Sequence, residues 1–283
     1  MTDTITCWPA PAKLNLFLHI TGRRPDGYHE LQTLFQLLDW GDEIQISIRP
    51  EPSIRRINEI EGIPGGEDLA VRAAQLLQKT CDCHLGADIR LIKNIPVGSG
   101  LGGGSSDAAT VLHALNHLWG CGLSMDLLAE LGLELGADVP VFVRGYSAWA
   151  EGIGEQLQSF ETGDPWYVLL FPDTAISTAE LFGHPGLERN SPSIRPSEYS
   201  WSGTENAFQS IAADRYPELG DAIEALSKWG SPRLTGTGSC IFLPINEKND
   251  ALGITNELKS RYNVRAVRGV SCSPLLAKLP DVN

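Results

Sequence analysis

The chain has 283 residues, of which 42% are hydrophobic and 20% are charged, so it can bury a large core in one domain or in two smaller ones. This composition excludes a collagen, a coiled coil and a disordered tail. Its 35 acidic and 22 basic residues give a formal net charge of −13, and such a field repels polyanions and anionic lipid. We therefore expect no nucleic-acid partner and no membrane partner.

The six cysteines indicate neither a zinc site nor a disulfide framework. Cys81 and Cys83 are spaced C-x-C, but no second pair and no matching histidines accompany them. The N-terminus lacks a basic start followed by a long apolar run, and no apolar stretch reaches the roughly 18 residues of a membrane span. These features predict reduced thiols and a soluble, cytoplasmic protein.

Alternation of polar and apolar residues predicts strands in the first third of the chain. Residues 12–20 (AKLNLFLHI) place four aliphatic side chains on one face, and Lys13 and Asn15 on the other. A second alternating strand is predicted over 43–48, after an apolar stretch at 31–38. A helical pattern at 67–78 and a strand from Ala87 follow. We expect this part to contain an antiparallel sheet.

Residues 96–107 (PVGSGLGGGSSD) are the most informative segment, because they lead directly into an apolar helical stripe. Glycines allow consecutive backbone N–H groups to turn toward an anion, and the helix that follows adds its positive end. The segment therefore predicts a phosphate-binding loop. A dinucleotide-binding fingerprint needs a strand that leads directly into the first glycine and an acidic residue about 20 positions later at the end of a strand. Here Pro96 interrupts such a strand, and position 118 lies in a predicted helix. No lysine closes the segment, which excludes a nucleoside-triphosphatase P-loop.

The rest of the chain mixes helices and strands without a regular βαβ repeat. Ser124 is the predicted cap of a helix that runs toward Gly136, and Asp138 lies between that helix and a predicted short strand from Val139 to Val143. Beyond these we predict strands at 166–171, 240–245 and 264–270, helices at 204–212, 217–229 and 247–261, a long loop at 183–203 and a second glycine loop at 234–239. The mixture predicts an α+β fold in two domains, 1–155 and 156–283.

Lys13 and Asp138 have the chemistry that phosphoryl transfer to an alcohol requires. Such a reaction needs a group that takes or orients the hydroxyl proton and a cation that steadies the developing charge. From composition alone, a lone lysine on a strand is more often solvated and a lone aspartate after a helix is more often a cap. His113 and His117 have the spacing of a metal pair, but no third ligand accompanies them, and we predict no metal site formed by the protein.

Four segments together resemble the GHMP kinase superfamily: residues 9–33, 96–109, 135–145 and 234–239. The resemblance spans nearly the whole chain. It implies two α/β domains with mixed and antiparallel sheets and an active site in the cleft between them. It also implies ATP, accompanied by Mg²⁺, under the glycine loop, and a small-molecule substrate, a cytidine-diphosphate-linked methylerythritol that is phosphorylated on its 2-hydroxyl in the non-mevalonate route to isoprenoids.

The resemblance implies a role for individual residues. Asp138 is expected to be the catalytic base and Lys13 its charge partner, and the expected substrate contacts are Asn15, Tyr28, His29 and Phe182. Cytosine is expected to stack between Tyr28 and Phe182, with His29 reading the base by its side chain or its backbone. The expected ATP-binding residues are Leu69, Pro96, Val97, Gly98, Ser99, Gly100, Leu101, Gly102, Gly103, Gly104, Ser105 and Ser106.

Two acidic residues near the expected nucleotide depart from this scheme. Asp68 stands where an asparagine often helps to hold adenine, and Asp107 places a negative charge in the first helical turn beneath the phosphates, where it opposes nucleotide binding unless it faces away. Other readings also stay open at this point. They are a GHMP kinase for an amino acid or a sugar, and a nucleotide-binding module without catalysis, against which the pair Lys13 and Asp138 argues.

Overall fold

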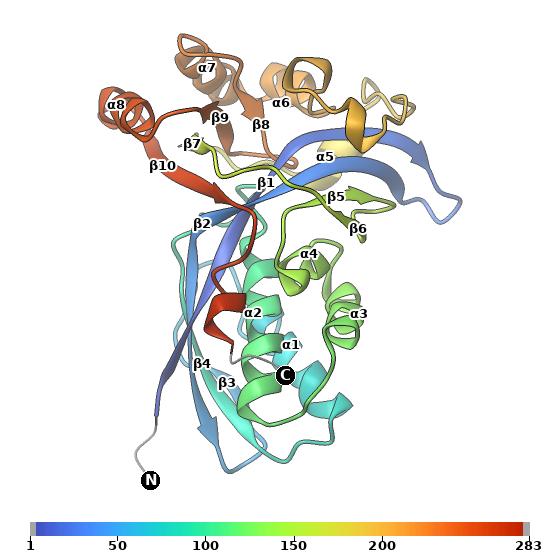
Figure 1. Ribbon diagram of the computed structural model, residues 1–283, viewed down its shortest axis with the longest axis vertical. Coiled ribbons are helices and arrows are strands. Elements are labelled where there is room, and N and C mark those ends of the chain that lie inside the picture. The colour runs from blue at the N-terminus through green and yellow to red at the C-terminus, as the bar shows by residue number, and fades with distance from the viewer. Residues whose placement is uncertain (1–3, 280–283) are drawn as a thin grey trace.

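Two long antiparallel strands connect the two halves of the molecule in the computed structural model, which describes residues 4–279 (Figure 1). β1 (Thr6–Arg23) and β2 (His29–Arg49) pair along most of their length. The predicted strand at 12–20 is confirmed as the middle of β1, and the predicted segments 31–38 and 43–48 belong to one continuous β2. Residues on both faces of β1 are buried in its middle, because helices and strands pack on either side.

The strands form one mixed sheet in the order β3-β4-β2-β10-β7-β9-β8. β3 and β4 pair in parallel, and the other described pairs are antiparallel, so the predicted antiparallel character is confirmed. The remaining strands are β3 (Ile54–Arg56), β4 (Gly86–Ile92), β5 (Ala148–Glu151), β6 (Gln156–Ser159), β7 (Trp166–Phe171), β8 (Arg233–Leu234), β9 (Ile241–Ile245) and β10 (Asn263–Val270).

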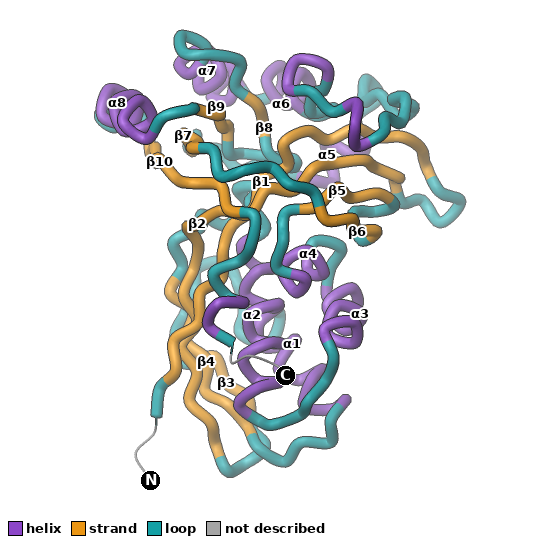
Figure 2. Tube along the Cα trace, viewed as in Figure 1, coloured by secondary structure: helices purple, strands orange, loops and turns teal. Residues whose placement is uncertain are grey.

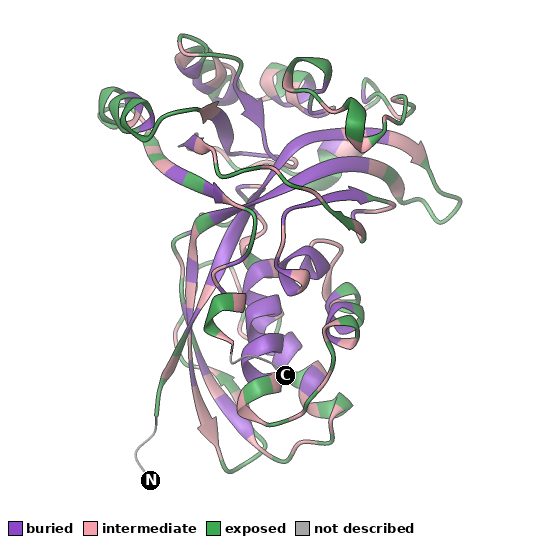
Figure 3. Ribbon diagram, viewed as in Figure 1, coloured by how far each residue is buried: buried purple, intermediate pink, exposed green. Residues whose placement is uncertain are grey.

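Helices pack on one side of the sheet in the first half of the molecule (Figure 2). α1 (Leu69–Thr80) begins after Asp68, whose side chain accepts the Ala70 N–H, and α3 (Met125–Leu135) begins after Ser124, the predicted cap. Between them α2 (Gly103–Leu118) follows the glycine loop. The residues of α2 from 106 to 115 are all buried, so this helix runs through the core and fixes the position of the loop (Figure 3).

The predicted strand at 139–143 is wrong, because these residues form the helix α4 (Val139–Arg144). Residues 139–143 are all buried, so the sequence shows an uninterrupted apolar run in place of a helical stripe. A short buried helix and a buried strand cannot be told apart by such a run, and the valines favour the strand interpretation. Pro140 is compatible with the first turn of a helix, where its missing N–H has no partner to lose.

The second half contains α5 (Thr178–Gly183), α6 (Gln209–Arg215), α7 (Pro217–Leu226) and α8 (Lys248–Leu258). The predicted long loop at 183–203 is confirmed, with 3₁₀ turns at Pro196–Glu198 and Trp201–Gly203. A third 3₁₀ turn, Leu276–Lys278, returns to the first half. Leu18 and Ile20 of β1 pack in the same apolar cluster as Val168 and Leu243, so β1 contributes to the core of both halves. Among the described residues, no helix has the length and hydrophobicity to cross a membrane.

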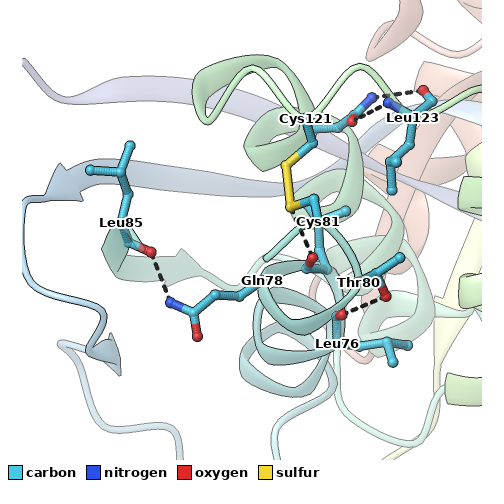
Figure 4. Close-up of a disulfide and its surroundings, with 9 residues drawn as sticks. Leu76, Gln78, Thr80, Cys81, Leu85, Cys121 and Leu123 are labelled. Carbon is cyan, nitrogen blue, oxygen red and sulfur yellow. Dashed lines mark hydrogen bonds between the residues drawn. A yellow bond between two sulfur atoms is a disulfide. The ribbon is translucent and has the colours of Figure 1, made fainter. Parts of the chain in front are cut away.

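Cys81 and Cys121 form a disulfide that connects the end of α1 to the loop after α2 (Figure 4). Their Cα atoms are 5.8 Å apart, which is within the range that a disulfide spans. The prediction of reduced thiols is therefore wrong for this pair. The other four cysteines are free: Cys7, Cys83, Cys240 and Cys272. The two bonded residues are far apart in sequence, and the spacing of cysteines alone does not show which side chains the fold brings together.

Candidate active site

Lys13 occupies a sheltered position on β1 where the sheet passes between the two halves. Its Nζ donates to Asn15 Oδ1 at 2.6 Å and to the Gly100 carbonyl at 3.1 Å, and it lies 3.3 Å from Asp138 Oδ2. The Lys13 side chain is 3% exposed, whereas that of Asp138 is 36% exposed. The ammonium is thus held in one place by three oxygen atoms, and the carboxylate beside it is open to a ligand.

Asp138 precedes α4, but it does not act as the capping residue that a structural role would predict. It occupies the N-cap position in a helical backbone conformation, and its side chain makes no capping hydrogen bond. Because the carboxylate is not engaged by the helix end, it is available to accept a proton or a hydrogen bond from a bound molecule.

The glycine loop takes the backbone conformation that an anion cradle requires. Gly98, Gly100 and Gly102 have φ values of 73°, 79° and 74°, in the left-handed region that glycine adopts without strain. A Cβ on Gly102 would come within 2.8 Å of the Phe142 ring, so this position also needs glycine for space. The loop therefore presents its backbone directly in front of the N-terminus of α2, where an anion is favoured.

Two buried hydroxyl groups beside this loop support its fit to phosphate. The Oγ atoms of Ser99 and Ser106 are buried, and neither has a hydrogen-bond partner within residues 4–279. A buried hydroxyl without a partner is unfavourable, and Ser99 lines the cavity in front of the loop. The residues present thus fit a phosphorylated ligand.

The second glycine loop packs against the first. The Cys240 N–H donates to the Ser99 carbonyl at 3.1 Å, and the Asn15 N–H donates to Thr235 Oγ1 at 2.9 Å. A Cβ on Gly100 would approach the Thr235 carbonyl oxygen to 2.3 Å. The two loops and β1 therefore position one another around Lys13.

A cavity of about 370 Å³ lies over the glycine loop. It is lined on one side by residues 96–105 and on the other by apolar side chains, including Leu69, which the resemblance assigned to ATP. Lys93 and Asp107 are among the polar residues of its lining. An apolar slot beside a phosphate cradle suits a nucleotide, since the slot takes a flat base and the cradle takes the phosphates.

The carboxylate of Asp107, which was expected to repel the phosphates, is paired with a lysine. Its Oδ2 lies 2.6 Å from Lys93 Nζ, and the same ammonium also contacts the carboxylate of Asp42. Burial raises the pKa of Asp107 to about 7, and the nearby Asp42 acts in the same direction, whereas Lys93 opposes it. The expected repulsion is therefore relieved by Lys93, a residue that the sequence analysis did not single out.

Both carboxylate oxygens of Asp68 have partners within the protein. One oxygen accepts the Ala70 N–H at 2.8 Å, and the other lies 2.7 Å from Arg56 Nη1 in a buried ion pair. This carboxylate holds the start of α1, and α1 in turn presents Leu69 to the cavity.

A second cavity, of about 620 Å³, is lined in part by Ala137, the residue before Asp138. Tyr28, His29 and Phe182 line it, although they come from the turn before β2, the first residue of β2 and α5. Tyr28 is 63% exposed, and the Phe182 ring lies 5.1 Å from that of His29 and 4.8 Å from that of Phe208. The residues expected to contact the base are thus brought together, with an exposed aromatic face available for stacking.

A third cavity, of about 400 Å³, joins these two. Lys13, Asn15 and Asp138 line it; it shares Gly100, Gly102 and Ser105 with the nucleotide-sized cavity, and Leu31, Ala137, Ile153 and Phe182 with the outer one. The three cavities therefore adjoin one another, and together they are called the channel here. Lys13 and Asp138 line its central part, and every predicted site residue except Ser106 lines one of the three cavities.

The sequence analysis missed Lys93, Thr235 and Arg189. Lys93 follows a predicted strand without any motif, and Thr235 lies in a glycine loop whose place near Lys13 is set by the sheet order. Arg189 lies in the predicted long loop, and its contact with His29 arises only when that loop packs on β2. No local signal in the sequence indicates any of these contacts.

Two family models match the chain, one in each half. The GHMP kinases N terminal domain matches residues 68–146, and the GHMP kinases C terminal domain matches residues 194–264. Together with the glycine loop and the channel, these matches define a small-molecule kinase of the GHMP class that uses ATP.

Similar proteins define the family more narrowly. A 4-diphosphocytidyl-2-C-methyl-D-erythritol kinase of Alkalilimnicola ehrlichii is 50% identical over 96% of this chain and 94% of its own length, and one of Pseudomonas fluorescens is 49% identical over the whole of both chains. The chain belongs to the 4-diphosphocytidyl-2-C-methyl-D-erythritol kinase family.

Solved structures agree with this assignment. A crystal structure of 4-(cytidine 5'-diphospho)-2C-methyl-D-erythritol kinase has a TM-score of 0.79 and 32% identity, and the match covers 94% of this chain and 100% of that one. The mevalonate kinase of Methanococcus jannaschii, at 16% identity, has a TM-score of 0.65 over 95% of this chain and 99% of its own. The second match confirms the GHMP kinase fold.

Proposed function

We propose that this protein transfers the γ-phosphoryl group of ATP to the 2-hydroxyl of 4-diphosphocytidyl-2-C-methyl-D-erythritol. The observation that carries the proposal is the set of three adjoining cavities, in which Lys13 and Asp138 line the one that shares residues with both the nucleotide-sized cavity and the outer, aromatic-lined cavity. The names of the relatives support the choice of acceptor.

Asp138 is the proposed general base. Its partly exposed carboxylate faces the central cavity and makes no capping hydrogen bond, so it can accept the proton of the acceptor hydroxyl. As this O–H bond breaks, the acceptor oxygen forms a bond to the γ-phosphorus, and the bond from that phosphorus to the leaving oxygen of ADP breaks. The proton remains on Asp138 until it passes to solvent.

Lys13 is the proposed charge partner. Its ammonium is fixed by Asn15 and the Gly100 carbonyl, and it lies 3.3 Å from the Asp138 carboxylate. A cation held in this way favours the negative charge that develops on the acceptor oxygen. Since Lys13 is nearly buried, this interaction is screened little by water.

The glycine loop is the proposed phosphate site, and Leu69 with the apolar wall beside it is the proposed base site. Mg²⁺ is expected to accompany ATP and to neutralise phosphate charge. Ser105 lines both the nucleotide-sized cavity and the central one and would offer an oxygen to this ion, and phosphates and water supply most ligands of Mg²⁺ in such sites.

Product analysis tests the proposal. The purified chain, with ATP and Mg²⁺, is expected to release ADP only when the cytidine-linked acceptor is present, and ³¹P NMR is expected to place the new phosphate on the 2-hydroxyl. Release of ADP at equal rates with a panel of amino acids or sugars, and none with the cytidine-linked compound, would assign the chain to a different acceptor.

A further inference from the structure

Arg189 joins the two sides of the outer cavity. This residue follows α5 and uses all three of its guanidinium nitrogens. Nη2 donates to the carbonyls of Phe182 and His184, both at 2.9 Å, Nη1 donates to the Leu187 carbonyl at 3.1 Å, and Nε donates to His29 Nε2 at 3.3 Å. One side chain from the long loop thus connects the end of α5 with the start of β2, the two elements that carry Phe182 and His29.

The contact with Arg189 determines which nitrogen of His29 carries the proton. A guanidinium can only donate, so Nε2 must accept with its lone pair, and the proton of the neutral ring must lie on Nδ1. Burial lowers the pKa of His29, and the charges of Arg189 and Arg23 lower it further. The ring also packs against Phe182, so the neutral form is held in one orientation.

Nδ1 of His29 is left as a hydrogen-bond donor without a partner. Within residues 4–279 this nitrogen makes no hydrogen bond, and His29 lines the outer cavity beside the exposed ring of Tyr28. A neutral N–H there suits an acceptor on the edge of a base. At ring position 3, cytosine presents an acceptor, whereas uracil presents a donor.

We propose that Arg189 is a positioning residue for acceptor recognition. It holds His29 as the neutral Nδ1–H tautomer and fixes Phe182 beside it, so that the His29 side chain donates to the ring nitrogen of cytosine. This inference rests on the proposed function for the identity of the base. It selects the side chain of His29, and not its backbone, as the group that reads the base.

Kinetics of Arg189→Gln test the proposal at saturating ATP. The expected result at pH 8 is a KM for the cytidine-linked acceptor about ten-fold higher, the order of one hydrogen bond, with kcat within two-fold of the wild type. Without Arg189 the neutral ring can place its proton on either nitrogen, and protonation restores the Nδ1–H. The KM of the variant is therefore expected to fall toward the wild-type value as the pH drops below about 6.5, the ordinary pKa of histidine.

The control is Arg215→Gln. Arg215 also binds α5, through an exposed ion pair to Glu180, but Glu180 does not line the cavity, whereas His29 and Phe182 do. Its loss is expected to leave the KM of the acceptor unchanged. A KM increase in Arg189→Gln that is the same at every pH would indicate that Arg189 only supports the loop, and an unchanged KM would remove it from recognition. Either result would overturn the proposal.

A measurement without substrate separates this inference from the proposed function. Nitrogen NMR of the His29 ring is expected to show Nε2 unprotonated in the wild type at neutral pH and a mixture of tautomers in Arg189→Gln and Arg189→Lys. A wild-type ring protonated on Nε2 would contradict the inference, whatever the acceptor is. If the tautomer is as expected but the cytidine-linked compound is not phosphorylated, the proposed function fails alone.

Discussion

Lys13 and Asp138 illustrate how the surroundings of a residue decide its chemistry. An ammonium as buried as that of Lys13 is unfavourable unless oxygen atoms compensate it, and here Asn15, the Gly100 carbonyl and Asp138 do so. The same lysine on a solvated strand would have no defined position. The interpretation of these residues as a surface lysine and a capping aspartate does not agree with their burial and their contacts.

Asp138→Asn is expected to lower kcat by on the order of 10²-fold or more, because the amide keeps the shape of the carboxylate but cannot take a proton. The dissociation constant for ATP is expected to stay within about three-fold, since Asp138 does not line the nucleotide-sized cavity. Asp126→Asn, at an exposed ion pair with Arg144, is the matched control and is expected to leave kcat unchanged. A near-normal kcat in Asp138→Asn would remove the base assignment.

Tyr28→Ala is expected to raise the KM of the cytidine-linked acceptor by about five- to 150-fold, because stacking of a base on an aromatic ring contributes roughly 1–3 kcal/mol. The exposed ring makes few contacts within the chain, so the thermal unfolding temperature is expected to stay the same. Steady-state kinetics and a melting curve on the same preparation check both statements. An unchanged KM would place cytosine elsewhere.

Asp107 is expected to make stability depend on pH. Its pKa is raised from 3.8 to about 7 in the folded chain, so between these values the folded state holds a proton that the unfolded state has lost. The stabilisation that comes from protonated Asp107 is therefore fully present below pH 3.8, and it is lost as the pH rises to about 7. Asp107→Asn keeps the acceptor for Lys93 and cannot titrate.

Urea titrations at several pH values check this expectation. Relative to the wild type, Asp107→Asn is expected to gain free energy of unfolding as the pH rises from about 4 to about 7. A difference between the two proteins that stays constant over that range would show that Asp107 ionises normally in the folded state.

Among the elements, those predicted correctly had a local pattern in the sequence, either polar and apolar residues in alternation or a capping residue at the start. β1 and the start of α3 at Ser124 were predictable because a period of two and a capping hydroxyl are local signals. α4 was not, because a buried run such as Val139 to Val143 has no polar face from which to read a period. The glycine loop was predictable from composition, since its conformation requires glycine.

Gly103→Val is expected to weaken ATP binding at least ten-fold and to leave the dissociation constant of the cytidine-linked acceptor unchanged. A Cβ at this position already lies 3.2 Å from Ile95 Cγ2, so a branched side chain must displace the wall of the nucleotide-sized cavity or the loop. Gly253→Ala in α8, where a Cβ meets nothing within 4 Å, is the control and is expected to stabilise the fold by up to about 1 kcal/mol. Equal weakening of both ligands would indicate general unfolding.

For the whole molecule, the site depends on contacts that only the complete sheet creates. β1 and β2 run through both halves, so Lys13 on β1 meets Gly100 and Asp138 of the first half and Thr235 of the second. The individual residues could be chosen from the sequence through the resemblance, but their meeting in one channel could not. It depends on the strand order, which no local pattern encodes.

The central claim is that the protein transfers phosphate from ATP to a cytidine-linked acceptor whose base lies in the outer cavity. The preference for this acceptor tests the claim most directly, because such a preference requires the nucleotide-sized cavity and the outer cavity to act in one reaction. The measurement is kcat/KM with ATP for 4-diphosphocytidyl-2-C-methyl-D-erythritol and for free methylerythritol. Stacking and a hydrogen bond in the outer cavity predict a ratio of at least about 10² in favour of the cytidine-linked compound. Equal values for the two acceptors would contradict the account, since the outer cavity would then contribute nothing to the choice of substrate.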